Sequence, residues 1–168
     1  MGVMTEPAAD ARAQGWPPED VALYEAHAPR LVALAAALAG PTDADDAVSA
    51  AVLRAFLTPG WRTVTNQSAY LTRAVVNEVR AGHRSALRRS AREARYTGRG
   101  ETVQRDGDPD PDLLAALARL PLQQRAVTFL TYWGDLTPFA VAAELGISEG
   151  SVRKYLVRAR STLRKGLQ

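Results

Sequence analysis

The chain has 168 residues and no cysteine, so disulfide bonds, thiolate metal sites and cysteine redox switches are excluded, and two histidines are too few to favour a metal centre. Its length allows one medium domain or two small ones, each with a modest core. The formal net charge is +3, but residues 83–105 and 137–168 are basic and the segments before them are acidic. This alternation is typical of a protein that contacts nucleic acid with some surfaces and another partner with others.

Residues 1–18 are rich in alanine, proline and charge and have no hydrophobic periodicity, which predicts a disordered N-terminal segment. This segment lacks the apolar core flanked by basic residues that is typical of a signal peptide. No run along the chain is expected to approach a membrane span. We therefore expect a cytoplasmic protein that does not contact a membrane.

The pattern of residues 19–89 predicts a bundle of three helices. The first begins at Glu19 and stops at Gly40-Pro41. The second begins at Thr42, where Thr42-x-x-Asp45 matches a capping box, and runs to about Leu57. The third is expected to be capped by Ser68 and to continue to the arginines near Arg88. The residues expected in the core are Val48, Val52, Phe56, Val75 and Val79.

Residues 90–111 read as a flexible linker, because they combine several glycines and prolines with alternating charge and almost no large apolar residue. The arginines from Arg92 to Arg105 fit a solvated linker as well as they fit a nucleic-acid surface. A linker of this kind predicts two domains that move independently in solution.

Residues 112–168 are predicted to form a second domain of four helices. Asp110 and Pro111 precede the first, and Pro121 begins the next, which Gly134 ends. A helix-turn-helix follows, in which Thr137 caps the first helix, Gly146 ends it and Ser148 caps the second. The apolar stripe of the first helix is expected to consist of Phe139, Val141, Ala142 and Leu145. No strand pattern is found in the sequence, so the predicted fold class is all-α.

The last helix has an apolar side and a basic side. The apolar side consists of Val152, Tyr155 or Leu156, Ala159 and Leu163, and the other side carries Arg153, Lys154, Val157, Arg158, Arg160 and Arg164. Arginine matches the acceptor edge of guanine and also binds phosphate, so this face suits the major groove of DNA. The alternative is a solvated amphipathic helix with cations near the negative end of its dipole. The preceding cap and turn favour DNA binding.

Two sets of motifs point to one family. In the C-terminal part they are Leu120-Pro121-x-x-x-Arg125-Ala126-Val127, Tyr132-x-x-Asp135-Leu136-Thr137 and Ala142-x-x-Leu145-Gly146-Ile147-Ser148-Glu149-Gly150-Ser151-Val152. In the N-terminal part they are Tyr24-x-x-His27-x-x-Arg30-Leu31, Asp43-Ala44-Asp45-Asp46-Ala47-Val48, Arg54-Ala55-Phe56 and Ala69-Tyr70-Leu71-x-Arg73-x-Val75-Val76-Asn77. The chain thereby resembles the extracytoplasmic function (ECF) group of bacterial sigma-70 family sigma factors, which consist of two helical domains, region 2 and region 4, joined by a variable linker.

The resemblance implies two DNA-binding sites. Region 4 would read the minus-35 promoter element with Arg153, Lys154, Val157 and Arg158, while Arg160 and Arg164 would hold phosphates. Region 2 would hold the melted minus-10 element, with an unstacked base at Asn77 and the aromatic ring of Tyr70 in place of the family's usual tryptophan. Arg73, Arg80 and Arg84, with Arg88 and Arg89 beyond them, would hold the strand's phosphates. The alternative for Asn77 is an ordinary polar residue on an exposed helix face.

The resemblance also implies protein partners: core RNA polymerase, and an anti-sigma factor between the two domains. The polymerase would be bound by the second helix through Asp43, Asp45, Asp46, Ser49 and Arg54. The family's usual Gln-Glu pair is replaced by Ser49 and Ala50, which is expected to weaken this docking. We expect no enzymatic activity, no cofactor and no small-molecule substrate, because no catalytic constellation or phosphate loop is found in the sequence.

Two other functions stay open from the sequence. One is a helix-turn-helix regulator that binds DNA alone and dimerises through its N-terminal bundle. The other is a degenerate paralogue that binds polymerase or an anti-sigma factor without supporting initiation, and Ser49-Ala50 is the feature that keeps it open. Two separate DNA-binding domains on one chain favour a sigma factor over both of these alternatives.

Overall fold

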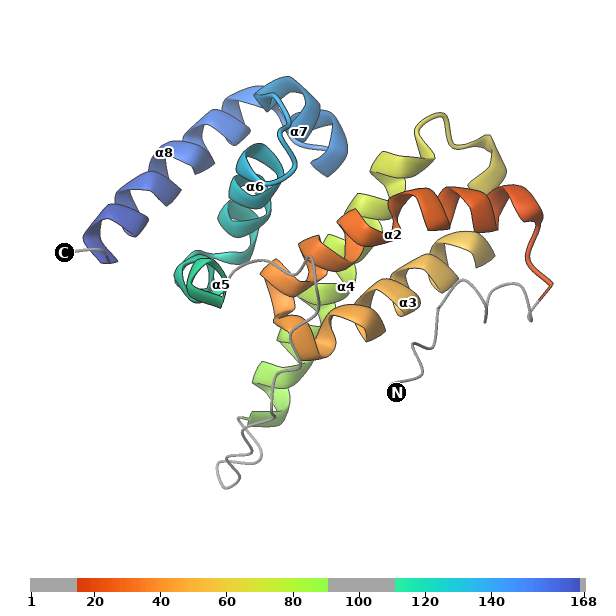
Figure 1. The fold of residues 1–168 in the computed structure, drawn as a ribbon, viewed down its shortest axis with the longest axis horizontal. Helices are drawn as coiled ribbons and strands as arrows, with labels where there is room; N and C mark the ends of the chain where they lie inside the picture. The colour runs from red at the N-terminus through yellow and green to blue at the C-terminus, as the bar shows by residue number, and fades with distance from the viewer. Residues whose placement is uncertain (1–14, 91–110, 167–168) are drawn as a thin grey trace.

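The computed structural model describes residues 15–90 and 111–166, and its regular structure there is entirely helical (Figure 1). The elements are α2 (Pro18–Ala39), α3 (Pro41–Leu57), the 3₁₀ helix η1 (Trp61–Thr63), α4 (Gln67–Ser90), α5 (Pro111–Ala118), α6 (Leu122–Tyr132), α7 (Pro138–Leu145) and α8 (Glu149–Gly166). The predicted all-α class is confirmed. The predicted linker and most of the predicted disordered segment lie outside the described residues.

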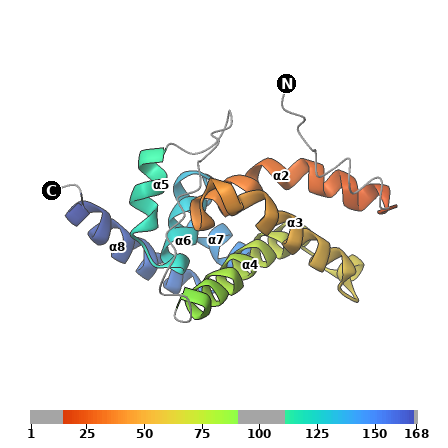
Figure 2. The same ribbon diagram turned by 90° about the horizontal axis from the view of Figure 1, so that it is seen from below.

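Helices α2, α3 and α4 pack on one another as the predicted three-helix bundle (Figure 2). Their core contains Tyr24, Leu31, Val48, Trp61 and Val75, all of them buried. Val52 and Val79 are buried as expected, whereas Phe56 is only half-buried. The side chains that the 3.6-residue period selects therefore form this core.

Helix α2 departs from the expectation that no run approaches a membrane span. Its 22 residues are long and apolar enough to meet that criterion by length and composition, the only such helix in the described residues. The physical reason is that its last charge is Arg30, and the residues after it, 31–39, are alanine, leucine and one valine. Leu31, Leu34 and Leu38 are nevertheless buried in the protein, where they pack against other helices, so α2 serves as a core helix here.

Two of the predicted helix starts are wrong. Helix α3 begins at Pro41, directly after Gly40, and no side chain caps it, so Thr42 lies inside the first turn instead of in a capping box. Proline suits this first position because its missing N–H would be unpaired there anyway. Helix α4 is capped by Asn66, whose Oδ1 accepts a hydrogen bond from the Ala69 N–H at 2.9 Å. This cap lies two residues before Ser68.

The helix-turn-helix is formed by the predicted caps. Thr137 Oγ1 accepts the Ala140 N–H at 3.2 Å, and Ser148 Oγ accepts the Ser151 N–H at 3.1 Å. Gly146 has φ 66°, the left-handed conformation that glycine adopts without a steric penalty. Phe139 does not belong to the apolar stripe, because its side chain is 74% exposed while Val141, Ala142 and Leu145 are buried.

The two groups of helices share a hydrophobic core. Leu34 and Leu38 of α2 and Val76 and Val79 of α4 belong to the same buried cluster as side chains from α5, α6, α7 and α8. Helix α2 contacts α5 and α6, and α4 contacts α7 (Figure 1). Because the three-helix bundle leaves these apolar side chains uncovered, the C-terminal helices pack on them. The structure thus shows the two predicted domains in contact, and their independent movement in solution stays a prediction.

Candidate nucleic-acid interface

The outer face of α8 carries an exposed group of basic residues. Arg153, Lys154, Val157 and Arg158 are all exposed, and Val157 is 65% exposed. The opposite face is buried through Val152, Leu156 and Ala159, with Leu156 as the buried member of the predicted pair and Tyr155 half-buried. Arg153 pairs with Glu149 one turn earlier. This cationic face, set at the second helix of a capped helix-turn-helix, fits a major groove.

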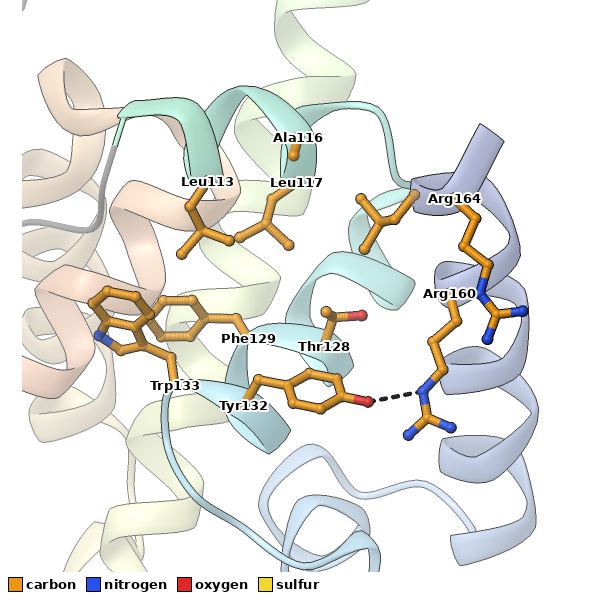
Figure 3. A pocket seen from close by; sticks show the side chains of 10 residues that line it. Leu113, Ala116, Leu117, Thr128, Phe129, Tyr132, Trp133, Arg160 and Arg164 are labelled. Carbon is orange, nitrogen blue, oxygen red and sulfur yellow. Dashed lines mark hydrogen bonds between the residues drawn. The ribbon is translucent and has the colours of Figure 1, made fainter. Parts of the chain in front are cut away.

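Arg160 and Arg164 continue the stripe of Arg153 and Val157 toward the C-terminal end of α8, and there they lie near α6 (Figure 3). Arg160 Nε donates a hydrogen bond to Tyr132 Oη at 2.8 Å, and its guanidinium carbon lies 5.8 Å from the centre of the Tyr132 ring. Both arginines remain exposed. Their predicted phosphate contacts stay a prediction, and the structure adds a protein partner for Arg160.

These two arginines border an apolar groove between α5, α6 and α8 (Figure 3). The cavity has a volume of about 490 Å³, and its lining consists of Leu113, Ala116, Leu117, Thr128, Phe129, Tyr132, Trp133, Arg160, Leu163 and Arg164. Tyr132 and Trp133 are 58% and 48% exposed. An apolar groove of this size suits a protein or other apolar partner better than it suits DNA. In the sequence, the only indication of this groove is the cluster of aromatic residues at the end of α6.

The five residues predicted to bind the minus-10 strand lie on one face of α4. Tyr70, Arg73, Asn77, Arg80 and Arg84 follow each other at intervals of three or four residues, the spacing of a single helix face. Asn77 and Arg84 are exposed, and the other three are half-buried. The structure therefore brings together all the predicted members of this site.

Two arginines of this α4 face contact the C-terminal helices. Arg73 Nη1 donates to the backbone oxygen of Ala143 at 3.3 Å, and Arg80 Nη2 donates to Gln123 Oε1 at 2.5 Å. Neither contact had a signal in the sequence, because each joins residues more than forty positions apart.

An aromatic cluster holds the turn that precedes α4. Trp61 is buried, and its Nε1 donates to Asp20 Oδ1 at 3.0 Å. The Trp61 ring lies 5.6 Å from that of Tyr70 and 5.1 Å from that of Phe56, measured between ring centres. Trp61 and Asp20 thus position Tyr70, a role that sequence reasoning missed.

The predicted polymerase-binding residues of α3 divide between two sides of the helix. Asp43, Asp46 and Ser49 are exposed. Asp45 is half-buried and lies toward Tyr24, where burial, and secondly the charge of Asp45, raise the pKa of the tyrosine hydroxyl. Arg54 forms an ion pair with Glu78 of α4 at 2.8 Å.

Two large exposed leucines continue the acidic face of α3. Leu53 and Leu57 are 45% and 68% exposed, and with Asp46 they follow the helical spacing along one side. We name this side the α3 face and define it as Asp43, Asp46, Ser49, Leu53 and Leu57. Acidic residues near its start and leucines near its end give it the character of a protein-binding surface. The leucines were missing from the predicted site.

Known proteins resemble both halves of the chain. The family model described as Sigma-70 region 2 matches residues 23–92, and Sigma-70, region 4 matches residues 111–163. Curated relatives include the ECF RNA polymerase sigma factor SigL of Mycobacterium tuberculosis, 34% identical over 161 residues with 88% of each chain covered. A co-crystal structure of the sigma factor RpoE with the anti-sigma factor NepR from Bartonella quintana aligns with TM-score 0.70 and 22% identity over 87% of this chain and 94% of that one. At this identity the likeness concerns the fold.

Proposed function

Since the chain belongs to the extracytoplasmic function group of the sigma-70 family, and so acts as a promoter-specific initiation subunit of RNA polymerase, we propose how its surfaces divide this task. Helix α8 reads the minus-35 element, the α4 face holds the melted minus-10 strand, and the α3 face docks on core polymerase. The observation that carries this proposal is the presence of two separate basic helix faces, on α4 and α8, within one chain.

The minus-35 element is read in the major groove by Arg153, Lys154, Val157 and Arg158. An arginine fork binds the O6 and N7 acceptors of guanine, and the apolar Val157 side chain suits a thymine methyl group. All four side chains are exposed on the same helix, so they reach the groove without rearrangement of α8. Arg160 and Arg164 contact the flanking phosphates.

The minus-10 strand is held along α4. The Asn77 amide both donates to and accepts from the edge of an unstacked base, and Tyr70 offers a ring for stacking. Arg73, Arg80 and Arg84 neutralise phosphates of the same strand. The Asp20–Trp61 hydrogen bond supports this site because it holds the ring on which Tyr70 packs.

Core polymerase is bound by the α3 face, where Leu53 and Leu57 supply apolar contact area beyond Ser49 and Ala50. The family's usual Gln-Glu pair is absent at those two positions, and the leucines one and two turns later offset the lost polar contacts. The groove between α5, α6 and α8 is a second protein-binding surface.

The chain itself carries out no catalysis, because phosphodiester bond formation belongs to the polymerase. It works in the cytoplasm, where promoter DNA and polymerase are found. Region 2 covers residues 19–89, region 4 covers residues 112–168, and residues 90–111 join them. A protein of the anti-sigma class is the expected negative regulator, in parallel with the Bartonella quintana sigma factor that was crystallised with one.

The proposal is tested by transcription in vitro from a library of randomised promoter DNA, with purified protein and core polymerase and no other sigma subunit. Discrete start sites enriched for two spaced elements are expected. A stand-alone regulator is instead indicated by tight DNA binding that needs no polymerase and yields no transcripts. Polymerase binding without transcripts indicates a degenerate paralogue, the second candidate that Ser49 and Ala50 favour.

A further inference from the structure

We propose that Tyr132 of α6 is a positioning residue of the minus-35 site, because it holds the guanidinium of Arg160 in the orientation that contacts a DNA phosphate. The inference rests on the proposed function, since it uses the phosphate contact assigned to Arg160. It adds to the site a residue that lies outside the helix-turn-helix. Its consequence is that the loss of one hydroxyl group from α6 weakens DNA binding by α8.

Arg160 lies at the end of the face proposed to enter the major groove. Its side chain is exposed, and it follows Arg153 and Val157 at intervals of four and three residues, so the three side chains form one stripe along α8. Arg164 continues this stripe by one further turn. Arg160 is therefore placed where a recognition helix passes from the bases to the sugar-phosphate backbone.

Two contacts with Tyr132 orient the Arg160 guanidinium (Figure 3). Arg160 Nε donates to Tyr132 Oη at 2.8 Å, and the guanidinium carbon lies 5.8 Å from the centre of the tyrosine ring. The hydrogen bond sets the direction of the Nε–H bond, and the ring attracts the positive charge. Together they restrict the rotation of a long side chain at its charged end.

These contacts leave the phosphate-binding edge of Arg160 free. A guanidinium has five N–H donors, and the hydrogen bond to Tyr132 uses the one on Nε. The four donors on Nη1 and Nη2 have no partner among the residues that the structure describes. These two nitrogens form the fork that binds two phosphate oxygens at once. Tyr132 therefore orients Arg160 without taking the place of a phosphate.

Arg160 differs in this respect from the other basic residues of α8. Arg153 pairs with Glu149 of its own helix, and Arg164 borders the same groove as Arg160. Within the described part of the chain, Arg160 is the one cation of α8 that a side chain from another helix holds. A freely rotating arginine loses much rotamer freedom when it binds, whereas Arg160 has lost part of this freedom on folding. We therefore expect Arg160 to contribute more to DNA affinity than Arg164.

The two helices that carry this pair are rigidly supported. Leu130 of α6 and Ala159 of α8 are buried in the same core cluster, one on each side of the contact. Gly134 follows the end of α6, where an added Cβ would lie only 2.7 Å from the Leu130 oxygen. The chain therefore turns tightly just after Tyr132. A side chain on such a support can hold its partner in one orientation.

The test measures binding of the full-length chain to a fluorescent DNA duplex of mixed sequence by anisotropy at about 50 mM salt. A phosphate contact does not depend on sequence, so neither a promoter nor polymerase is needed. Tyr132→Phe keeps the ring and removes the hydroxyl group, and it is expected to weaken binding about threefold, as one lost hydrogen bond would. Arg160→Ala is expected to weaken binding about tenfold and to reduce the salt slope by about one. Arg164→Ala is expected to weaken it less.

A double-mutant cycle separates positioning from a merely structural role. Tyr132→Phe is expected to cause no further loss of affinity in a protein that already carries Arg160→Ala, because the tyrosine acts through that arginine. A tyrosine that only stabilised the fold would weaken DNA binding equally in both backgrounds. Tyr155→Phe is the matched control, since Tyr155 is a half-buried tyrosine of α8 that holds no arginine among the described residues. Its affinity is expected to equal that of the wild type.

Four results would overturn the inference. They are an unchanged affinity of Tyr132→Phe, a higher affinity of this variant, an equal loss in both backgrounds, and a wild type that does not bind the duplex. A higher affinity would mean that Tyr132 withholds Arg160 from DNA. Circular dichroism checks that each variant is folded. Transcription by the wild type with core polymerase is scored separately, so the proposed function stands if the positioning role fails, and it falls only if the wild type neither binds polymerase nor starts transcription.

Discussion

The outer face of α8 carries the single side chains that we propose read the minus-35 element. Arg158 is exposed and on the same helix face as Lys154, clear of the groove that Arg160 and Arg164 border. Residues in such a position discriminate between bases, whereas residues toward the flanks of the helix contact phosphate. The two roles differ in how a substitution affects a set of DNA sequences.

Arg158→Ala is expected to weaken binding of the preferred minus-35 duplex by about 1–3 kcal/mol and to relax the preference at one base pair, because one bidentate contact to guanine is lost. The measurement is competition of duplex variants for the polymerase complex. Lys165→Ala, with the same charge change in the last turn of α8, serves as the control and is expected to weaken all duplexes slightly and equally. Equal loss for all sequences with Arg158→Ala would assign this arginine to phosphate.

At the scale of helices, local sequence signals explain the helix-turn-helix. The proposed binding of a partner protein depends instead on which face of α3 is exposed. Thr137, Gly146 and Ser148 form their caps within a few residues of sequence. The α3 face, by contrast, can be identified only from the structure, because the packing of α2 and α4 decides which side of α3 stays exposed. Each feature predicts a different measurable effect.

The Thr137 cap predicts a stability effect. Thr137→Ala is expected to lower the free energy of unfolding by about 1 kcal/mol, because the Ala140 N–H loses its acceptor. Urea denaturation followed by circular dichroism measures this loss. Ser161→Ala, at an exposed position inside α8, is the matched control with no expected loss beyond a few tenths of a kcal/mol. A null effect of Thr137→Ala would mean that water replaces the cap.

The α3 face predicts a binding effect. Leu53→Gln with Leu57→Gln is expected to weaken affinity for core polymerase by about 1–3 kcal/mol, since two exposed leucines lose their apolar contact with the partner. Leu87→Gln is the control, because Leu87 is 69% exposed but lies at the far end of α4. Biolayer interferometry with immobilised core polymerase measures all three proteins. Unchanged affinity of the double variant would remove the leucines from the docking surface.

At the scale of the whole molecule, the two predicted domains share one core. One buried cluster contains side chains from α2 and α4 together with side chains from α5 to α8. The Arg125 side chain also links the two groups of helices, because it donates hydrogen bonds to backbone oxygens at the end of α2 and after α5. Such a core couples the stability of the two parts.

The shared core predicts one cooperative unfolding transition. Urea unfolding followed by tryptophan fluorescence and by circular dichroism is expected to give a single midpoint, because opening either part exposes the core of the other. Arg125→Ala is expected to lower the free energy of unfolding by about 1–3 kcal/mol, since the part-buried carbonyl oxygens of Leu38 and Leu120 lose this donor. Arg119→Ala, an exposed arginine close by in sequence, is the control. Two separated midpoints in the wild type would show that the parts unfold independently.

The sequence by itself determined the all-α class, the helix-turn-helix and the resemblance that led to the family. These depend on local order: a 3.6-residue apolar period, caps within three residues of a helix start, and glycine where the backbone turns left-handed. The misplaced caps at Thr42 and Ser68 show the limit of this information, because Pro41 and Asn66 offered equally local alternatives.

Only the tertiary structure decided which side chains share a surface. Phe139 was expected in the apolar stripe of its helix but is exposed, and Leu53 and Leu57, which were in no predicted site, are exposed on α3. The contacts of Arg73, Arg80 and Arg30 with the C-terminal helices join positions 43 to 114 residues apart. Their partners depend on how whole helices pack, and packing depends on the combined shape of many side chains, which no local pattern encodes.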